Sequence, residues 1–272
     1  MRIGISSWAY PWAVGVPGHQ PERPLTAFDL VDRAAELEVG VLQVADNLPL
    51  HRMGEAELDR LLELARSSGV ELEVGTIGFD PQHLLGYLGI ARRLRSPFVR
   101  VVIDTLDHSP SDSEIGETLR TVTPAYERAG LKLLIENHDH RKAADLKRFL
   151  EESGSDALGI CLDTLNSLGC HEPVDTVLDQ LEPWVENVHV KDFTVERTNC
   201  RLAFLIEGAP ISEGVLDISG LVSRLNASRG NDLSWIVELW PPRVEGGLEQ
   251  TIAAERLWVE RSVAHLRQSA SD

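Results

Sequence analysis

The sequence has few cysteines and no long uninterrupted apolar stretch. Its three cysteines, Cys161, Cys170 and Cys200, form no CxxC pair, which argues against a disulfide framework and against a thiolate zinc site. The N-terminus lacks the apolar run of a signal peptide, and the chain offers no stretch of about 18 apolar residues that could span a membrane. We therefore expect a cytoplasmic protein with no membrane partner.

Basic side chains are also scarce. The chain has 26 Lys and Arg residues against 43 Asp and Glu residues, which gives a net charge of −17 at pH 7. Such a charge repels a phosphate backbone, so we expect no nucleic-acid partner. The glycine-rich phosphate motifs GxGxxG and GxxxxGK[ST] are missing, and so is the nucleophile motif GxSxG, which argues against nucleotide binding at such loops and against covalent nucleophilic catalysis.

What the sequence does contain is a regular alternation of short apolar runs and segments with helical spacing of apolar residues. Apolar side chains make up 43 % of the 272 residues, enough for a large core. Eight runs rich in Val, Ile and Leu are predicted strands. They cover residues 2–7, 39–45, 70–77, 98–104, 131–136, 158–163, 185–190 and 234–239.

Segments with helical spacing of apolar residues are predicted helices, and they cover residues 26–38, 55–69, 82–96, 113–130, 143–154, 217–230 and 251–268. Several end in glycine, for instance Gly69, Gly130 and Gly154, where a helix C-cap is expected. Eight strands alternating with helices over this length indicate an α/β fold, a (β/α)8 TIM barrel, as a single domain over residues 1–272. The connection 193–215 is too long for a simple turn, and we expect it to build or cover the active site.

Four side chains that can bind metals stand at the ends of four successive predicted strands. In a closed barrel the carboxyl ends of the strands converge on one mouth, which brings distant residues together. Three buried carboxylates without a cation would repel one another and would lose hydration. An imidazole with carboxylates suits Mn²⁺ or Mg²⁺, with Co²⁺ or Zn²⁺ as alternatives. The predicted ligands are Glu136, Asp163, His189 and Glu238.

The motifs around these residues resemble a known family. "IENH", "LDT", "VHVKD" and "VEL" follow one another in the order and approximate spacing of the xylose isomerase-like barrel superfamily, which contains sugar phosphate isomerases and epimerases. The resemblance covers nearly the whole chain. It implies that Glu136 and Glu238 are catalytic, exchanging a proton with the substrate beside the metal. Relatives are often dimers or tetramers, which makes a homo-oligomer one option for this chain, although the sequence itself does not indicate an oligomeric state.

The reaction implied by this resemblance is proton transfer next to a carbonyl of a small sugar, sugar acid or cyclitol, through a metal-stabilised enediolate. The alternative is a metal-dependent lyase, either a dehydratase or a decarboxylase, that acts on an oxo-sugar acid or an inosose. A sugar-binding barrel without catalysis is a further alternative. Epimerases of this group often have a histidine where this chain has Asn166, which weighs against a ketose epimerase.

Further polar and aromatic residues near the predicted strand ends are candidates for binding the substrate. Lys191 shares the inward face of His189, and either it contacts the substrate or it pairs with Asp192 or Glu136. Arg100 either recognises a carboxylate or phosphate or forms a structural pair inside the barrel. Aromatic walls with a few polar groups suit a sugar. The remaining candidates for substrate contacts are Trp8, Tyr10, Asp46, Asn47, His138 and Asn166.

Overall fold

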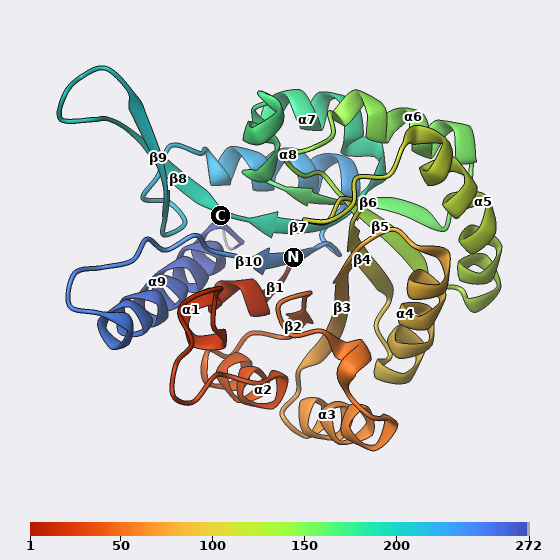
Figure 1. Cartoon of the computed structure of the whole chain (residues 1–272), viewed down its shortest axis with the longest axis horizontal. Coiled ribbons are helices and arrows are strands. Elements are labelled where there is room, and N and C mark those ends of the chain that lie inside the picture. The colour runs from red at the N-terminus through yellow and green to blue at the C-terminus, as the bar shows by residue number, and fades with distance from the viewer. Residues whose placement is uncertain (271–272) are drawn as a thin grey trace.

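A computed structural model describes residues 1–270, and within them eight parallel strands close into a barrel. Around the ring the strands follow the order β1-β10-β7-β6-β5-β4-β3-β2, so that the first and last barrel strands pair with each other (Figure 1). The predicted (β/α)8 barrel is therefore confirmed. The barrel strands are β1 (Arg2–Ser6), β2 (Val41–Val44), β3 (Glu71–Ile77), β4 (Phe98–Val102), β5 (Lys132–Glu136), β6 (Leu158–Asp163), β7 (Val185–Val190) and β10 (Ser234–Val237).

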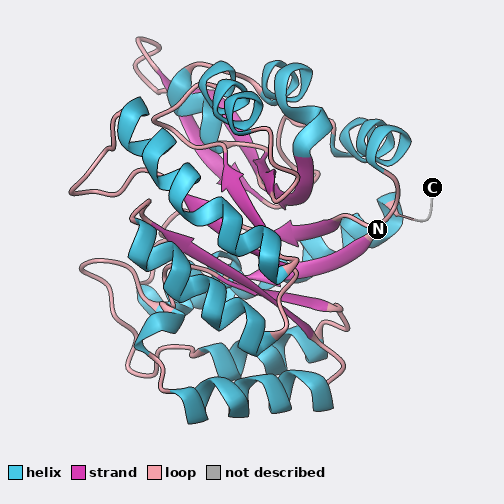
Figure 2. Cartoon of the chain, turned by 90° about the vertical axis from the view of Figure 1, so that its right-hand side faces the viewer, coloured by secondary structure: helices cyan, strands magenta, loops and turns pink. Residues whose placement is uncertain are grey.

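Helices surround the barrel on its outside, as Figure 2 shows. None of the helices within residues 1–270 is long and apolar enough to cross a membrane. The short helix α7 has no counterpart among the predicted segments. The helices are α1 (Pro11–Val14), α2 (Ala27–Glu36), α3 (Glu55–Ser67), α4 (Pro81–Leu94), α5 (Asp112–Ala129), α6 (Ala143–Ser153), α7 (Val174–Leu181), α8 (Ile218–Arg229) and α9 (Leu248–Ser269).

Local sequence signals set the ends of these helices. Ser111 begins α5 with a capping box, because its hydroxyl accepts from the backbone N–H of Glu114 while that carboxylate accepts from the backbone N–H of Ser111. Gly130 and Gly154 end α5 and α6 in the left-handed conformation, with φ of 64° and 61°, which costs glycine little. The next strand then starts within a few residues, so each helix returns the chain to the amino end of the barrel.

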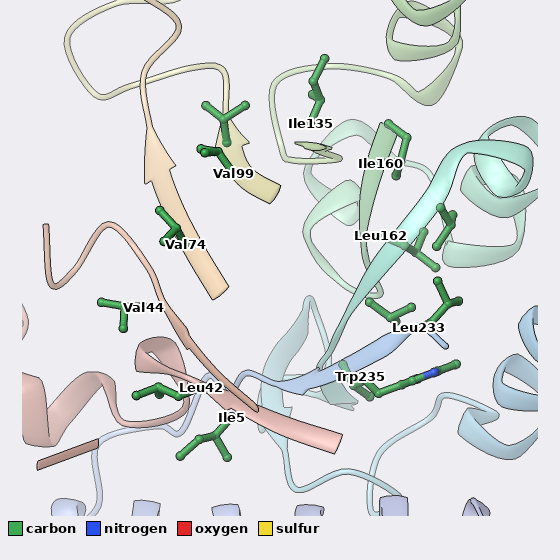
Figure 3. Close-up of a cluster of buried hydrophobic side chains, with 14 of the residues drawn as sticks. Ile5, Leu42, Val44, Val74, Val99, Ile135, Ile160, Leu162, Leu233 and Trp235 are labelled. Carbon is green, nitrogen blue, oxygen red and sulfur yellow. The ribbon is translucent and has the colours of Figure 1, made fainter. Parts of the chain in front are cut away.

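The two faces of the barrel strands differ in chemistry. The outward face is apolar and packs with the helices in one continuous core (Figure 3), where Ile5, Leu42 and Trp235 are fully buried. The inward face carries many buried polar and charged side chains, together with apolar ones such as Phe98, Leu134 and Ile236. Since strand residues alternate between faces, the helix-covered face supplies the hydrophobic burial while the interior positions polar groups.

The long connection after β7 forms a hairpin instead of a loop. Strands β8 (Asp192–Arg197) and β9 (Phe204–Ala209) pair antiparallel in a two-stranded sheet of their own. In Figure 1 this hairpin projects away from the barrel. It starts directly after Lys191, so its base lies at the carboxyl end of the barrel, where the predicted site residues are.

Candidate functional site

A cavity of about 370 Å³ opens at the carboxyl ends of the barrel strands. This is the end at which catalytic residues of such barrels lie. The cavity combines charged side chains with two indoles, a composition suited to a small polar molecule. It is lined by Trp8, Asp46, Ile77, Arg100, Val102, Leu106, Glu136, His138, Asn166, Lys191, Glu238 and Trp240.

The four predicted metal ligands converge at the base of this cavity. The Nδ1 atom of His189 lies 3.3 Å from Glu136 Oε2, 3.4 Å from Glu238 Oε1 and 3.9 Å from Asp163 Oδ2. All four side chains are buried. They come from β5, β6 and β7 and from the residue after β10, so the barrel brings together residues that are up to about a hundred positions apart in the sequence.

The hydrogen bonding of these atoms fits a divalent cation. Glu136 Oε2, His189 Nδ1 and Glu238 Oε1 are buried and have no hydrogen-bond partner among the described residues. Buried polar atoms are rarely left unsatisfied, and each one needs an explanation. Asp163, His189 and Glu238 form one of the two groups in residues 1–270 whose atoms are close enough to share an ion. Three atoms of the right chemistry that lie close together without a hydrogen-bond partner are the arrangement that a metal ion would satisfy.

Lys191 contacts two of the same carboxylates. Its Nζ lies 2.5 Å from Asp163 Oδ2 and 2.9 Å from Glu238 Oε2. The expected pairing of Lys191 with Asp192 or Glu136 is therefore wrong. The alternation of the strand explains this, because Lys191 points inward with His189, toward the ends of β6 and β10, while Asp192 points the other way. Burial alone would lower the pKa of Lys191, but Asp163 and Glu238 outweigh it and raise this pKa, so the ammonium stays charged.

Arg100 is the second buried cation of the site. Its Nε lies 3.2 Å from Glu136 Oε2, and its Nη1 lies 3.3 Å from Asp46 Oδ1. Together with Asp163 and Glu238, the site holds four carboxylates against the two cations Arg100 and Lys191. With a neutral imidazole the remaining charge is that of two carboxylates, which one divalent cation would balance.

A polar network beneath the cavity fixes the orientation of His189. Gln43 Nε2 donates to Glu73 Oε2 at 3.1 Å and to Asn187 Oδ1 at 3.2 Å. The amide oxygen of Gln43 therefore faces His189 Nε2, at 2.6 Å, and accepts its hydrogen. A neutral imidazole with its proton on Nε2 presents the lone pair of Nδ1 to the site, as a metal ligand must.

The charges of the site shift the pKa values of its acids. Burial would raise the pKa of Glu136, but Arg100 and His189 outweigh it and hold this pKa well below its usual range. Burial likewise opposes ionisation of Glu238, and His189 and Lys191 lower its pKa. For His189, burial lowers the pKa while Glu238 and Glu136 raise it, with a net rise. Both glutamates are therefore ionised at neutral pH.

Most of the predicted substrate contacts line the cavity. Trp8, Asp46, Arg100, His138, Asn166 and Lys191 do so. Asn166 also donates from Nδ2 to Glu136 Oε1 at 2.8 Å, which fixes the carboxylate plane and leaves Oε2 directed at His189. Whether these side chains touch a substrate stays a prediction.

Two predicted contacts lie elsewhere. Tyr10 is buried and lines a separate depression with Arg33 and Arg256, because the chain turns through the short helix Ser7–Ala9 and leads Tyr10 away from the mouth. Asn47 does not line the cavity and exchanges two hydrogen bonds with Ser7, at 2.5 and 3.0 Å. Its amide ties the ends of β1 and β2 together.

Asn137 and Asp192 fix different parts of the structure around the site. Asn137 exchanges hydrogen bonds with the backbone N–H and C=O of Asp163, both at 2.8 Å, and so positions it. Asp192 instead accepts from the backbone N–H groups of Ser212, Gly214 and Leu216. It holds the segment after β9 and does not orient the imidazole.

Three residues of the site were missed by the sequence analysis. Gln43 and Glu73 lie inside the predicted strands 39–45 and 70–77, and a polar residue within such an apolar run was the signal that could have identified them. Trp240 follows the motif "VEL" and lines the cavity with its ring 5.6 Å from Lys191 Nζ. Aromatic rings beside polar groups suit a sugar or sugar-acid ligand.

A closed parallel barrel with a carboxylate and imidazole cluster at its mouth defines a class of sugar-converting enzymes, and the family comparison agrees with it. The family model described as xylose isomerase-like TIM barrel matches residues 107–268. The chain belongs to this family, and the resemblance noted in its motifs is confirmed. It is an enzyme of this superfamily.

Comparisons with individual proteins give one relative that is similar over nearly the whole chain, and solved structures that share the fold. The chain is 31 % identical over 266 residues to a 3-oxo-isoapionate decarboxylase of Pectobacterium atrosepticum, a match that covers 98 % of this chain and 95 % of the relative. Among solved structures, a D-psicose 3-epimerase in the presence of D-fructose superposes with a TM-score of 0.73 at 13 % identity, covering 100 % of both chains. An L-ribulose 3-epimerase gives 0.71 at 14 % identity, covering 99 % of this chain and 94 % of the other.

Proposed function

We propose that this protein is a divalent-metal-dependent decarboxylase that acts on a 3-oxo sugar acid. The observation that carries the proposal is the full-length similarity to the 3-oxo-isoapionate decarboxylase, since the epimerase structures share the fold at much lower identity. The lyase alternative is thus favoured over the isomerase or epimerase that the motifs first suggested.

Glu136, Asp163, His189 and Glu238 would hold the metal, and Mn²⁺ or Mg²⁺ suits this oxygen-rich set best. When bound, the ion would polarise the 3-oxo group and stabilise negative charge that develops on its oxygen. This assignment is supported by three buried atoms without a hydrogen-bond partner, Glu136 Oε2, His189 Nδ1 and Glu238 Oε1.

The residues around the cavity suit the loss of carbon dioxide. In this reaction the bond to the carboxyl carbon breaks, its electron pair moves toward the 3-oxo oxygen, and the carbon that is left takes up a proton. No carboxylate has to remove a proton from carbon, which agrees with the low pKa values of Glu136 and Glu238. The charged groups of Lys191 and Arg100 favour an anionic substrate in the cavity.

Proton delivery falls to a side chain that is not buried with the metal ligands. His138 lines the cavity, and its Nδ1 lies 2.5 Å from Asp139 Oδ1. This contact orients the imidazole ring. We assign to His138 the transfer of this proton to the carbon that loses carbon dioxide.

An isomerase or epimerase is the second candidate. The observation in its favour is that two carboxylates, Glu136 and Glu238, approach the same imidazole nitrogen from β5 and from the end of β10. Two such groups could remove a proton from one face of a carbon and return it on another.

One experiment separates the two reactions. The metal-loaded protein is incubated in D₂O with a panel of 3-oxo sugar acids carrying ¹³C in the carboxyl group, and with matched keto-sugars. Release of labelled carbon dioxide, with one deuterium gained by the product, supports the decarboxylase. Deuterium gain with every carbon retained would instead establish the isomerase. Glu136→Gln protein serves as the control, and removal of the metal by a chelator should stop either reaction.

A further inference from the structure

Residues 1–270 contain two groups of side chains whose ligand atoms lie close enough to share an ion, and the two groups overlap at His189. One group is Asp163, His189 and Glu238 at the mouth. The other is Glu136, Cys161 and His189, and its three ligand atoms lie within 4.8 Å of one another. This second group brings in a sulfur ligand that the proposed metal site does not use.

Cys161 is fixed beside two of the metal ligands. It lies on β6 two residues before Asp163, so its side chain points into the barrel one layer deeper than that carboxylate. It is fully buried and stands in register with Glu136 on the neighbouring strand β5. Its thiol donates to Asn187 Oδ1 at 3.0 Å. The sulfur therefore carries a proton, and a metal that binds it replaces that proton.

The other two members of the second group each present an atom that has no hydrogen-bond partner among the described residues. These atoms, Glu136 Oε2 and His189 Nδ1, are buried and lie 3.3 Å apart. The second ring nitrogen of His189 is held by Gln43, which leaves Nδ1 as the nitrogen that can bind an ion. Arg100 forms an ion pair with Glu136 Oε2, but a carboxylate oxygen has lone pairs for both a guanidinium and a metal. Two unsatisfied ligand atoms thus lie beside the sulfur.

The two groups of ligands favour different ions. Two carboxylates with an imidazole form a hard, oxygen-rich set that suits Mn²⁺ or Mg²⁺. A thiolate makes the second group softer, and soft ligands select Zn²⁺ and similar ions. Zinc binds sulfur, nitrogen and carboxylate oxygen, and three protein ligands with one water complete its tetrahedron. The thiolate of Cys161 and the carboxylate of Glu136 supply two negative charges, which balance one divalent ion.

We propose that Glu136, Cys161 and His189 form a second ion position, which we call the deep position, and that it binds thiophilic divalent ions such as Zn²⁺ and Cd²⁺. As the metal–sulfur bond forms, the thiol proton passes to water that the ion sheds on entering. Asn187 Oδ1 loses the thiol but keeps the N–H of Gln43, at 3.2 Å. This inference concerns which ions the barrel binds and is independent of the reaction catalysed.

The deep position and the mouth group exclude each other. Both need Nδ1 of His189, and the one lone pair of this atom binds one ion. An ion in the deep position therefore displaces Mn²⁺ from the mouth, where Lys191 still contacts Asp163 and Glu238. We expect Zn²⁺ and Cd²⁺ to bind in competition with Mn²⁺, with one ion per chain.

Ultraviolet difference spectroscopy of the full chain with Cd²⁺ tests the sulfur ligand, because a thiolate bound to Cd²⁺ gives a charge-transfer band that carboxylate and imidazole ligands do not give. We expect this band in the wild type and its loss in Cys161→Ser, whose hydroxyl can still donate to Asn187. The matched control is Cys170→Ser/Cys200→Ser, in which Cys161 is the one cysteine left, and it should keep the band. A wild type without the band, or a Cys161→Ser protein that keeps it, overturns the proposal.

A competition measurement tests whether the two positions share His189. Mn²⁺ bound to the wild type is titrated with Cd²⁺, and electron paramagnetic resonance measures the Mn²⁺ released, which should be one ion for each Cd²⁺ bound. Cys161→Ser should raise the Cd²⁺ dissociation constant at least about 100-fold, as loss of a metal ligand does, and should leave that of Mn²⁺ within about three-fold. A chain that holds both ions at once would refute the shared ligand, and equal Cd²⁺ constants in the two proteins would refute the deep position.

Discussion

Two buried glutamates inside the barrel, one at the mouth and one a layer below, behave in opposite ways. Glu136 at the mouth faces Arg100 and His189, which hold its pKa well below the usual range against the effect of burial. Glu73, in the layer below, receives N–H groups from the neutral amides of Gln43 and Asn187, and burial raises its pKa. The same residue type is thus ionised in one layer and driven toward neutrality in the next.

The difference in charge indicates that the two layers have different roles. The mouth layer concentrates charge, which can bind a metal ion and an anionic substrate. The lower layer consists of hydrogen bonds between mostly neutral groups, which fix geometry without adding a further charge. Gln43 joins the two layers, because its amide group contacts both Glu73 and His189.

The largest effect is expected from removing charge in the mouth layer. Glu136→Gln keeps the shape of the side chain but removes a carboxylate that faces Arg100 and His189. We expect kcat/KM to fall by roughly 10²–10⁴-fold, with less metal retained per chain. Steady-state kinetics and elemental analysis measure the two effects. Activity within a few-fold of the wild type would show that the mouth layer is not the catalytic one.

A third buried carboxylate lies outside the barrel interior, and we expect it to make the stability of the fold depend on pH. Glu255 on α9 accepts from the backbone N–H groups of Trp12 and Ala13, and burial raises its pKa to about 8. Its folded-state pKa exceeds the unfolded value, so its contribution to stability is complete below the unfolded pKa and is lost as the pH rises through the folded one.

Glu255→Gln removes this pH dependence. Between pH 5 and pH 8 the unfolding free energy of the wild type should fall relative to the variant by on the order of 3 kcal/mol. Urea unfolding at a series of pH values measures the difference between the two proteins, which cancels other titrating groups. Parallel curves for the two proteins would show that Glu255 is not held neutral.

The next largest effect is expected from Gln43, whose amide group connects the two layers. Gln43→Leu removes the acceptor of the His189 Nε2 hydrogen, so the imidazole loses the partner that fixes its tautomer. We expect the metal dissociation constant to rise about 10–100-fold, as for other partners of metal-bound histidines. Calorimetric titration with Mn²⁺ measures this change. An unchanged affinity would mean that the carboxylates alone orient the site.

The smallest effect is expected in the lower layer. Glu73→Gln makes the same chemical change as Glu136→Gln, but at a carboxyl whose pKa burial has raised. The glutamine oxygen can still accept from Gln43 and Asn187, so kcat/KM should stay within about five-fold of the wild type. The same kinetic assay therefore compares both layers. A loss as large as that of Glu136→Gln would erase the distinction between them.

The sequence predicted the barrel because its strands and helices each carry a strong periodic signal. The strands β6 and β7 match their predicted residues 158–163 and 185–190. The meeting of Glu136 and His189 followed from the closure of the barrel alone. Closure sets which strand ends are neighbours, and that needs no knowledge of side-chain conformations.

What the sequence did not reveal depends on how the chain turns after each strand. A single 3-10 turn after β1 places Tyr10 away from the mouth. The spacing of apolar residues in the sequence gives no sign of this turn. The partners of Lys191 depend on its inward direction at the end of β7. The sequence predicted a long connection over 193–215 but not the hairpin formed by β8 and β9. Its apolar residues, such as Val195 and Ile206, are exposed, so burial in a core does not explain the pattern.

The positions of the two chain ends determine where a tag can be attached without covering the cavity. β1 begins at Arg2, at the end of the barrel opposite the cavity, and the Arg267 side chain near the end of α9 donates to the backbone oxygens of Leu37 and Glu38 at that same end. A tag, a fusion partner or a solid support attached beside residue 2 or near the end of α9 therefore lies at the end of the barrel opposite the cavity. Immobilised in this way, the molecule would keep its opening turned toward the solution.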